Sequence, residues 1–578
     1  MSKPPHAARG DWRCWLFGGP QATAELAARG KDEALAAMLV QALDAHGVAA
    51  FTLFTGPFAA VAYESSRDRC WVVRDQLGAH PLLYAPALDG ALFAEHERDL
   101  LARLPRTPSP DRLGVLGWIE NGMPPAQRTL YEGIKRVPAG GRLSLGEHVA
   151  VERWWQPRYA GVQEGTAAEL GERLRDAAFD AVSRAASDAR RAAVKLSGGL
   201  DSSSVAAGLA AGGFASRGAL ALGGTFADYL EADERELIEA TARQTELPLE
   251  LIAYDAGRSM LAPALAHIER WRVPPGSPNL FLWQPLFARA SELGVDVLLD
   301  GEGGDEVYGF APYLIADRLR RGRLLDAWSL TARIPGIDVH PDPRLRVRLR
   351  LLRHYGVRPL VPSFIRRRRQ ARAQAKAAST ALIGAHDRTL LAALREAGEQ
   401  HRDGPHWWQT HAHELIDMRE QLDMAGHFRR ETIDAGIAIR HPLLHDLPLI
   451  ETALRIPPAA QFAAERNRPL LRDALRGQIP EQVRTRRVKS HFTDLVLGGM
   501  HAGEAELIEP LRRADAPLRA YVGAAALERW LALAPEDRPL LGAGPLWRLA
   551  IANRWLLAQG GSPPADRTRG GTPPAGGR

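Results

Sequence analysis

The 578-residue sequence has few cysteines and no long apolar run. Two cysteines, Cys14 and Cys70, are too few for a disulfide framework, which favours a reducing compartment. The stretch MSKPPHAARGDWRCW lacks the apolar core of a secretory signal, and no run of about eighteen apolar residues occurs. Basic residues number 74 and acidic residues 68, so the net charge of +6 is small for this length. We therefore expect a cytoplasmic protein that contacts neither membrane nor nucleic acid.

The length suggests two or more domains, and the 46% hydrophobic content is enough for packed cores. Residues 1–160 hold short strand-like runs between turn residues, among them 12–17, 49–54 and 58–63, which predict a β-rich first domain. Residues 165–558 begin with alternating helices and strands, which predict a parallel sheet, and continue into an Arg- and Leu-rich helical region. Residues 559–578 are rich in Gly and Pro and predict a disordered tail.

A glycine turn between a short strand and a helix is the first candidate site. Residues 192–196 predict the strand and residues 201–211 the helix, with Ser197-Gly198-Gly199 between them. Asp201 and the serines after it are placed to cap the first helical turn. Backbone N–H groups and the positive end of the helix dipole form an anion site, which is not a P-loop because no GK[ST] follows. The residues expected to hold the anion are Leu196, Ser197, Gly198, Gly199, Asp201, Ser202 and Ser203.

A second glycine-rich stretch is acidic. Residues 295–299 predict a buried strand that runs directly into DGEGGDE, residues 300–306. Ligands of open α/β sheets bind at the carboxyl ends of the strands, where this stretch would lie. An acidic loop would repel an anion bound at the glycine turn, so a cation is required, and the carboxylates of Asp201 and Asp305 suit Mg²⁺.

The first motif resembles the SGGxDS loop of the ATP pyrophosphatase superfamily, which cleaves ATP between its α- and β-phosphates. Together, SGGLDSS and DGEGGDE resemble the synthetase domain of asparagine synthetases. The resemblance implies an α/β parallel-sheet domain of the ATP pyrophosphatase (adenine nucleotide alpha hydrolase-like) type with helical insertions, using ATP and Mg²⁺. Asp300 and Gly301 would then contact the nucleotide, and residues 225–228 would form a wall for the adenine. Glu302 would orient an incoming amine or accept its proton, or would simply be a loop carboxylate near Mg²⁺.

Three later segments extend the resemblance. Residues 439–444, IRHPLL, are similar to the R-x-P-F-L-D segment of the family, although its end differs. Arg468 stands where the K-x-x-L-R segment has lysine. RTRRVKSHF is similar to R-x-K-x-x-F, which assigns Lys489 to the catalytic lysine that stabilises charge as pyrophosphate leaves or as the tetrahedral intermediate forms.

The first domain is similar to the glutaminase domain of the same family, through residues 56–84, TLYEGIKRVPAGGRL and RWWQP. The resemblance implies an α+β, Ntn-type fold. In that family the nucleophile is a cysteine directly after the initiator Met, but position 2 here is Ser2, and Cys14 lies in a strand-like run. We expect a domain that has kept the fold and lost glutamine hydrolysis.

With no ammonia supply, the amine should belong to the substrate itself. Among relatives that close a ring, the length, the Arg-rich helical region and RHPLL resemble the lasso-peptide cyclases, which join a peptide's N-terminal amine to an Asp or Glu side chain. Such a cyclase would take a precursor peptide as substrate, with a leader protease and a leader-binding protein as partners. The alternatives are a β-lactam synthetase, for which Tyr254 or Tyr308 would have to pair with the acidic residue, or an ammonia-dependent asparagine synthetase. A non-catalytic peptide-binding scaffold is a further alternative of another class.

Overall fold

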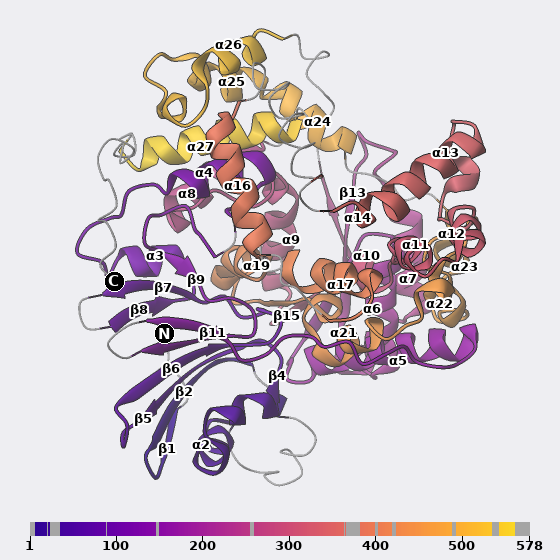
Figure 1. Cartoon of the computed structure of the whole chain (residues 1–578), viewed down its shortest axis with the longest axis horizontal. Helices are drawn as coiled ribbons and strands as arrows, with labels where there is room; N and C mark the ends of the chain where they lie inside the picture. Colours follow the sequence, from indigo (N-terminus) through magenta and orange to yellow (C-terminus); the bar gives the residue numbers. More distant parts are fainter. Residues whose placement is uncertain are drawn as a thin grey trace.

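The computed structural model describes residues 6–19, 21–22, 35–87, 90–125, 127–145, 149–254, 259–362, 365, 382–398, 403–418, 424–487, 493–533 and 543–560. Two domains, each built on its own sheet, lie side by side in these residues (Figure 1). Several predictions concern residues outside this set: Ser2, Lys489 and the tail from residue 561 onward.

The first domain is built on an antiparallel six-stranded sheet. Its order is β1 (His6–Arg9), β2 (Trp12–Gly18), β5 (Phe58–Glu64), β6 (Arg69–Arg74), β10 (Gly141–Leu145) and β11 (Ala150–Arg153). Alternate side chains of β2 point to one face, where Trp12, Cys14 and Leu16 pack against helix α2 (Leu35–His46). The other face packs on a smaller sheet of β8 (Gly90–Ala94), β7 (Leu83–Ala87) and β9 (Lys135–Arg136). The domain is thus an α-β-β layering, visible at the lower left of Figure 1.

The strand predicted at residues 49–54 is wrong for most of its length. Residues Gly47–Leu53 form the 3₁₀ helix η1, and only Phe54–Thr55 forms a short strand, β4, paired with β3 (Gln21–Ala22). A short apolar run does not distinguish a strand from a buried helical turn, and here Ala50 and Phe51 bury their side chains from the helix. In the part of the chain that the structure describes, one segment, Leu35–Leu53, is long and apolar enough to cross a membrane; 44% of its window is buried, and it packs in the core of the first domain.

The second domain holds the predicted parallel sheet. Its order is β14 (Leu249–Ala253), β13 (Leu220–Thr225), β12 (Ala192–Leu196), β15 (Val297–Leu299) and β16 (Ala438–Arg440), and all neighbours are parallel. The chain leaves β12 toward β13 on one side and later adds β15 on the other. The order therefore reverses between β12 and β15, and open α/β sheets bind ligands in the crevice at such a switch point.

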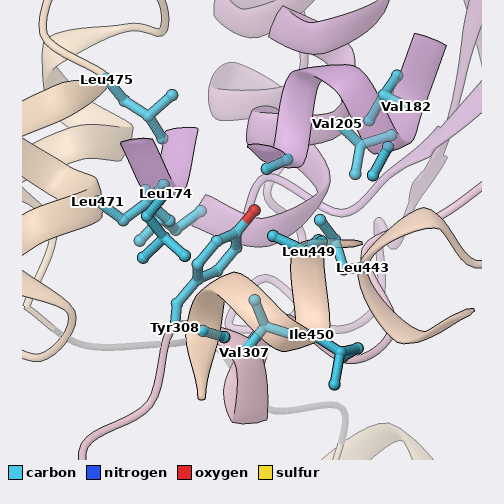
Figure 2. Close-up of a cluster of buried hydrophobic side chains, with 14 of the residues drawn as sticks. Leu174, Val182, Val205, Val307, Tyr308, Leu443, Leu449, Ile450, Leu471 and Leu475 are labelled. Atoms are coloured by element: carbon cyan, nitrogen blue, oxygen red, sulfur yellow. The ribbon is translucent and has the colours of Figure 1, made fainter. Parts of the chain in front are cut away.

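Helices cover both faces of this sheet. The helices α6 (Leu200–Ala211), α7 (Arg235–Gln244) and α9 (Leu280–Glu292) follow the predicted pattern, and α5 (Ala167–Ala186) begins at a capping box of Thr166 and Glu169. Below the sheet's carboxyl edge, a core of aliphatic side chains from α5, α6, α10 (Gly304–Val307), α20 (Pro442–His445) and α21 (Leu447–Ala453) fixes the helices that carry the loops (Figure 2).

The remaining helices form the side of the molecule away from the first domain and a cap over both domains. The first group comprises α11 (Leu314–Arg320), α12 (Leu324–Thr331), α13 (Arg344–Leu351) and α14 (Arg358–Leu360), whereas α17 (His406–Ala412) lies between this group and the first domain. The cap includes α16 (Ala385–Gly398), α24 (Thr493–Ala502), α25 (Glu504–Arg512), α26 (Ala524–Leu531) and α27 (Ala543–Ala558). From α27, the Arg548 Nε donates to the carbonyl of Ile119 in helix α4 (Arg112–Asn121) of the first domain, at 2.7 Å. The C-terminal helix thereby ties the two domains together.

Candidate active site

Two loops meet at the carboxyl edge of the parallel sheet, as the sequence predicts. One follows β12 and the other follows β15, and Val194 of β12 is paired with Leu299 of β15. The acidic loop lies directly on the start of α6, because a Cβ added to Gly301 would lie 2.7 Å from the backbone nitrogen of Ser202. A Cβ on Gly304 would overlap the carboxyl group of Asp201. The glycines of DGEGGDE thus allow the two loops to touch.

The glycine turn after β12 closes on itself. Gly198 has a positive φ of 75°, and the backbone N–H of Ser197 donates to the Ser202 hydroxyl at 3.2 Å. Gly199 is the N-cap residue of α6 and has no side chain to cap the helix, and the carboxylate of Asp201 forms an ion pair with an arginine. Capping of the first turn by Asp201 stays a prediction. Ser203 turns away from the loop, since its hydroxyl lies 3.3 Å from that of Thr241 in α7. Contact of these residues with a nucleotide stays a prediction.

Asp201 and Asp305 are brought together by one guanidinium group. Arg468, at the start of α22 (Pro469–Ala474), donates from Nη1 to Asp201 and from Nη2 to Asp305. Only 8% of the Arg468 side chain is exposed, against 13% for Asp201 and 60% for Asp305. The two carboxylates predicted to bind Mg²⁺ are therefore close enough to share a single cation.

This pair fits Mg²⁺ bound through a nucleotide. Mg²⁺ in such sites takes one or two carboxylates and completes its octahedron with phosphate oxygens and water. Among the described residues, no group of three or more His, Cys, Asp or Glu side chains is placed to hold a metal without such help. We conclude that Asp201 and Asp305 suit a cation that arrives with a triphosphate.

A buried charged cluster behind the acidic loop was missed by the sequence analysis. Asp300 has no exposed surface, and its Oδ1 lies 2.8 Å from Nδ1 of His441, while Oδ2 lies 3.5 Å from Nζ of Lys195. Burial alone would raise the pKa of Asp300, but His441 and Lys195 outweigh it and hold that pKa at about 2. In the sequence, Lys195 is a single charged residue within an apolar strand. Its pairing with Asp300 could therefore not be predicted. Because the Asp300 carboxylate binds His441 and Lys195, we expect any contact between Asp300 and a nucleotide to be made by its backbone.

Glu302 lies beside this cluster and is partly exposed. Its backbone N–H donates to Oδ1 of Asp300 at 3.1 Å, so the buried carboxylate fixes the loop at the predicted catalytic residue. The position of the other predicted catalytic residue, Lys489, lies outside the described residues. The chain just before it is anchored at the site, because Arg486 binds Glu234 at 2.6 Å and Glu234 packs against Gly198.

A pocket opens beside the β12 loop. It is lined by Lys195, Ser197, Gly224, Phe226, Tyr254 and Trp283, among others. Phe226 stacks on Tyr254, with ring centroids 5.1 Å apart. Of the region predicted as an adenine wall, Phe226 is the residue that lines this pocket.

Neither tyrosine considered for a β-lactam synthetase is a free acid–base group. Tyr254 donates its hydroxyl to the carbonyl of Leu282. Tyr308 has no exposed surface and packs among aliphatic side chains below the acidic loop (Figure 2), and this burial raises its pKa above the ordinary value. Both hydroxyls serve the core of the domain.

Neither cysteine of the first domain has the properties of a reactive nucleophile. Cys14 is fully buried in β2, its sulfur lies 3.3 Å from the carbonyl oxygen of Ala36, and burial raises its pKa to about 11. Burial likewise raises the pKa of Cys70 to about 11. A thiol with such a pKa is almost entirely protonated at neutral pH and is a poor nucleophile.

Comparison with known proteins divides the chain as the two sheets do. A family profile described as Asparagine synthase matches residues 173–557, and one described as Glutamine amidotransferase domain matches residues 24–155. Asparagine synthetase [glutamine-hydrolyzing] 3 of Bacillus subtilis (strain 168) is 26% identical over 276 residues, which are 45% of this chain and 44% of that relative. The chain thus matches less than half the length of this curated relative.

Among solved structures, the glutamine phosphoribosylpyrophosphate amidotransferase from B. subtilis, complexed with ADP and GMP, shares 11% identity. The alignment covers 56% of this chain and 61% of that one with a TM-score of 0.19, which is too low to support an argument. The profiles alone therefore show an amidotransferase-like first domain followed by a synthase domain with a parallel sheet.

Proposed function

Because the chain belongs to the asparagine synthase family, we propose that it is an ATP-dependent, AMP-forming ligase that closes an amide ring within a peptide. The second domain would have the ATP pyrophosphatase fold with helical insertions, and the first a degenerate Ntn-type fold. The observation that carries the proposal is the meeting of the two loops, which places Asp201, Asp305 and Glu302 at one sheet edge.

The reaction has two steps. First, an oxygen of a peptide carboxylate attacks the α-phosphorus of ATP, the bond to the bridging oxygen breaks, and pyrophosphate leaves. Then an amine nitrogen attacks the acyl carbon, the C–N bond forms and AMP leaves. Bound Mg²⁺, held by Asp201 and Asp305, would neutralise phosphate charge. Glu302 would accept the proton that the amine loses, and Lys489 would stabilise the leaving oxygens.

The burial of Cys14 supports an amine that belongs to the substrate. Cys14 is inaccessible and Ser2 stands at the position of the family nucleophile, so we expect no cysteine-dependent release of ammonia from glutamine by the first domain. We propose a lasso precursor peptide as substrate, whose Asp or Glu side chain is adenylated and whose N-terminal amine closes the ring. A leader protease, a leader-binding protein and a cytoplasmic location belong to this proposal, and a nucleic-acid partner does not.

Two measurements separate the steps. Peptide-dependent exchange of labelled pyrophosphate into ATP reports adenylation alone, whereas loss of one water from the peptide mass reports ring closure. Asp201→Asn should abolish both. Glu302→Gln should keep part of the exchange and lose ring closure on the order of a hundred- to ten-thousand-fold. Glu236→Gln, an exposed change on α7, is the matched control.

The results also test the reaction class. Primary products of ADP and orthophosphate would refute an AMP-forming ligase. Full ring closure by Glu302→Gln would refute its role as base. Amide formation from free aspartate and ammonia, with no turnover of a precursor peptide encoded beside this chain, would indicate an ammonia-dependent asparagine synthetase.

A further inference from the structure

Three neighbouring strands of the parallel sheet each place one polar or charged side chain at its carboxyl end, below the acidic loop. Lys195 comes from β12, Asp300 follows β15 and His441 follows β16. Their residues are 8%, 0% and 3% exposed. We refer to them as the strand-end triad. From it, we infer that Lys195 and His441 are positioning residues that act through Asp300 to hold Glu302 in place for amine attack.

Each atom of the Asp300 carboxylate has a defined task. Oδ1 accepts from the Glu302 backbone N–H at 3.1 Å and from His441 at 2.8 Å. Because a carboxylate only accepts hydrogen bonds, Nδ1 of His441 must carry the hydrogen. Oδ2 faces Nζ of Lys195 at 3.5 Å, the distance of an ion pair. Rotation of the carboxylate would break the bond that fixes Glu302.

Lys195 is itself held in place from the other side. Its Nζ lies 4.1 Å from the ring centroid of Trp283 in α9 and 5.5 Å from that of Phe428 in α19 (Met424–Thr432). The Phe428 ring in turn contacts His441, with centroids 4.7 Å apart. Cation–π contacts of this kind fix a buried ammonium group over aromatic faces. The cluster therefore has little freedom, as a device that orients a loop requires.

A stabilising role alone does not account for the cluster. Burying an ion pair costs desolvation energy, and an apolar replacement of the pair is often as stable. Asp300, however, also accepts a hydrogen bond from the backbone N–H of Glu302, the residue proposed as the base. Buried charges beside a candidate site are a pointer to function for this reason.

The test rests on the proposed ligase activity and uses four full-length proteins: wild type, Lys195→Met, Asp300→Asn and the double variant. Lys195→Met should leave the KM for ATP and the pyrophosphate exchange within about twofold and slow ring closure at least tenfold. The double variant should close the ring at least threefold faster than Lys195→Met, because it removes both buried charges and keeps an oxygen that accepts from Glu302. Lys135→Met, on an exposed strand residue of the first domain, is the control.

Other results would overturn the inference. A raised KM for ATP with loss of exchange in Lys195→Met would make Lys195 a nucleotide contact. Exchange and ring closure that fall in parallel with thermal stability would make the triad purely structural. If the fold-losses in ring closure of Lys195→Met and Asp300→Asn multiply in the double variant, the two residues act independently and Lys195 does not act through Asp300. If wild type catalyses neither reaction, the proposed function fails instead, and thermal unfolding of the same four proteins still measures whether Lys195 and Asp300 are coupled.

Discussion

Arg468 holds the two carboxylates that we assign to Mg²⁺, which predicts how the protein responds to the metal without nucleotide. Arg468 is buried and donates to both Asp201 and Asp305. Arg468→Met removes the shared cation and leaves two carboxylates that face each other. We expect this variant to bind Mg²⁺ in the absence of ATP, and wild type to bind it much more weakly.

The magnitude follows from the geometry. Two oxygens bound to the two nitrogens of one guanidinium lie on the order of 5 Å apart, and at an effective dielectric constant of about 20 two unit charges at that distance repel by about 3 kcal/mol. The exposure of Asp305, 60%, allows water to screen part of this energy. Relief of even half of it corresponds to about a tenfold gain in Mg²⁺ affinity.

Thermal unfolding measured across a Mg²⁺ titration is a suitable assay. At ten times its Kd, a ligand specific to the folded state adds about 1.4 kcal/mol to the free energy of unfolding. Arg466→Met is the matched control, because Arg466 lies in the same segment and pairs with Asp473 at 2.7 Å, away from both carboxylates. Na⁺ at equal ionic strength controls for screening.

Equal responses of wild type and Arg468→Met to Mg²⁺ would refute the reasoning. It would mean that the two carboxylates separate when the arginine is removed, or that they do not form a cation site. Calcium as a second probe distinguishes these cases, since Ca²⁺ tolerates looser geometry than Mg²⁺.

Three further predictions concern the glycine loop, the thiols and the response to acid. Gly301→Ala should weaken ATP binding, measured as KM in the exchange assay, because its Cβ would lie 2.7 Å from the Ser202 nitrogen; Gly19→Ala, with no atom within 4 Å of its Cβ and no positive φ, is the control. Glutamine should yield no glutamate above background, and Cys14→Ala should leave ring closure intact; glutamate release that depends on Cys14 would overturn the assignment of the first domain. Burial lowers the pKa of His411 to about 4, so the unfolded state takes up a proton below about pH 6.5 and the folded state does not. Stability should therefore fall by about 2 kcal/mol between pH 7.5 and pH 5 on account of His411, and His411→Leu should flatten the thermal unfolding midpoint over this range, unlike the exposed His386→Leu.

The elements that carry the loops could be predicted because their patterns are local. Strand β12 was predicted residue for residue, and α6 within one residue of its start. The apolar run and the glycines that end it determine both. The proximity of Asp201 and Asp305 also follows from the sequence, since parallel strands place their carboxyl ends at one edge.

The partners of these residues could not be predicted. Arg468 comes from a segment far along the chain from Asp201 and Asp305. Its backbone has a positive φ of 53°, which the local sequence does not predict. Lys195 has apolar neighbours in β12, and only the fold shows that Asp300 neutralises it. Long-range ion pairs depend on which strands become neighbours, and periodicity along one segment holds no information on that.

The strand order has a consequence for biosynthesis. Strand β15 ends at Leu299 and its neighbour β16 begins at Ala438, so a ribosome must translate a long helical region before the last strand can join the sheet. Until then the nascent chain exposes one edge of β15, with unpaired N–H and C=O groups that another chain can bind. During the same interval the Asp300 carboxylate lacks its hydrogen bond from His441, because His441 has not yet been translated. Chaperone dependence in the cell should therefore be greatest for chains arrested between these two strands, and least once residue 445 has left the exit tunnel.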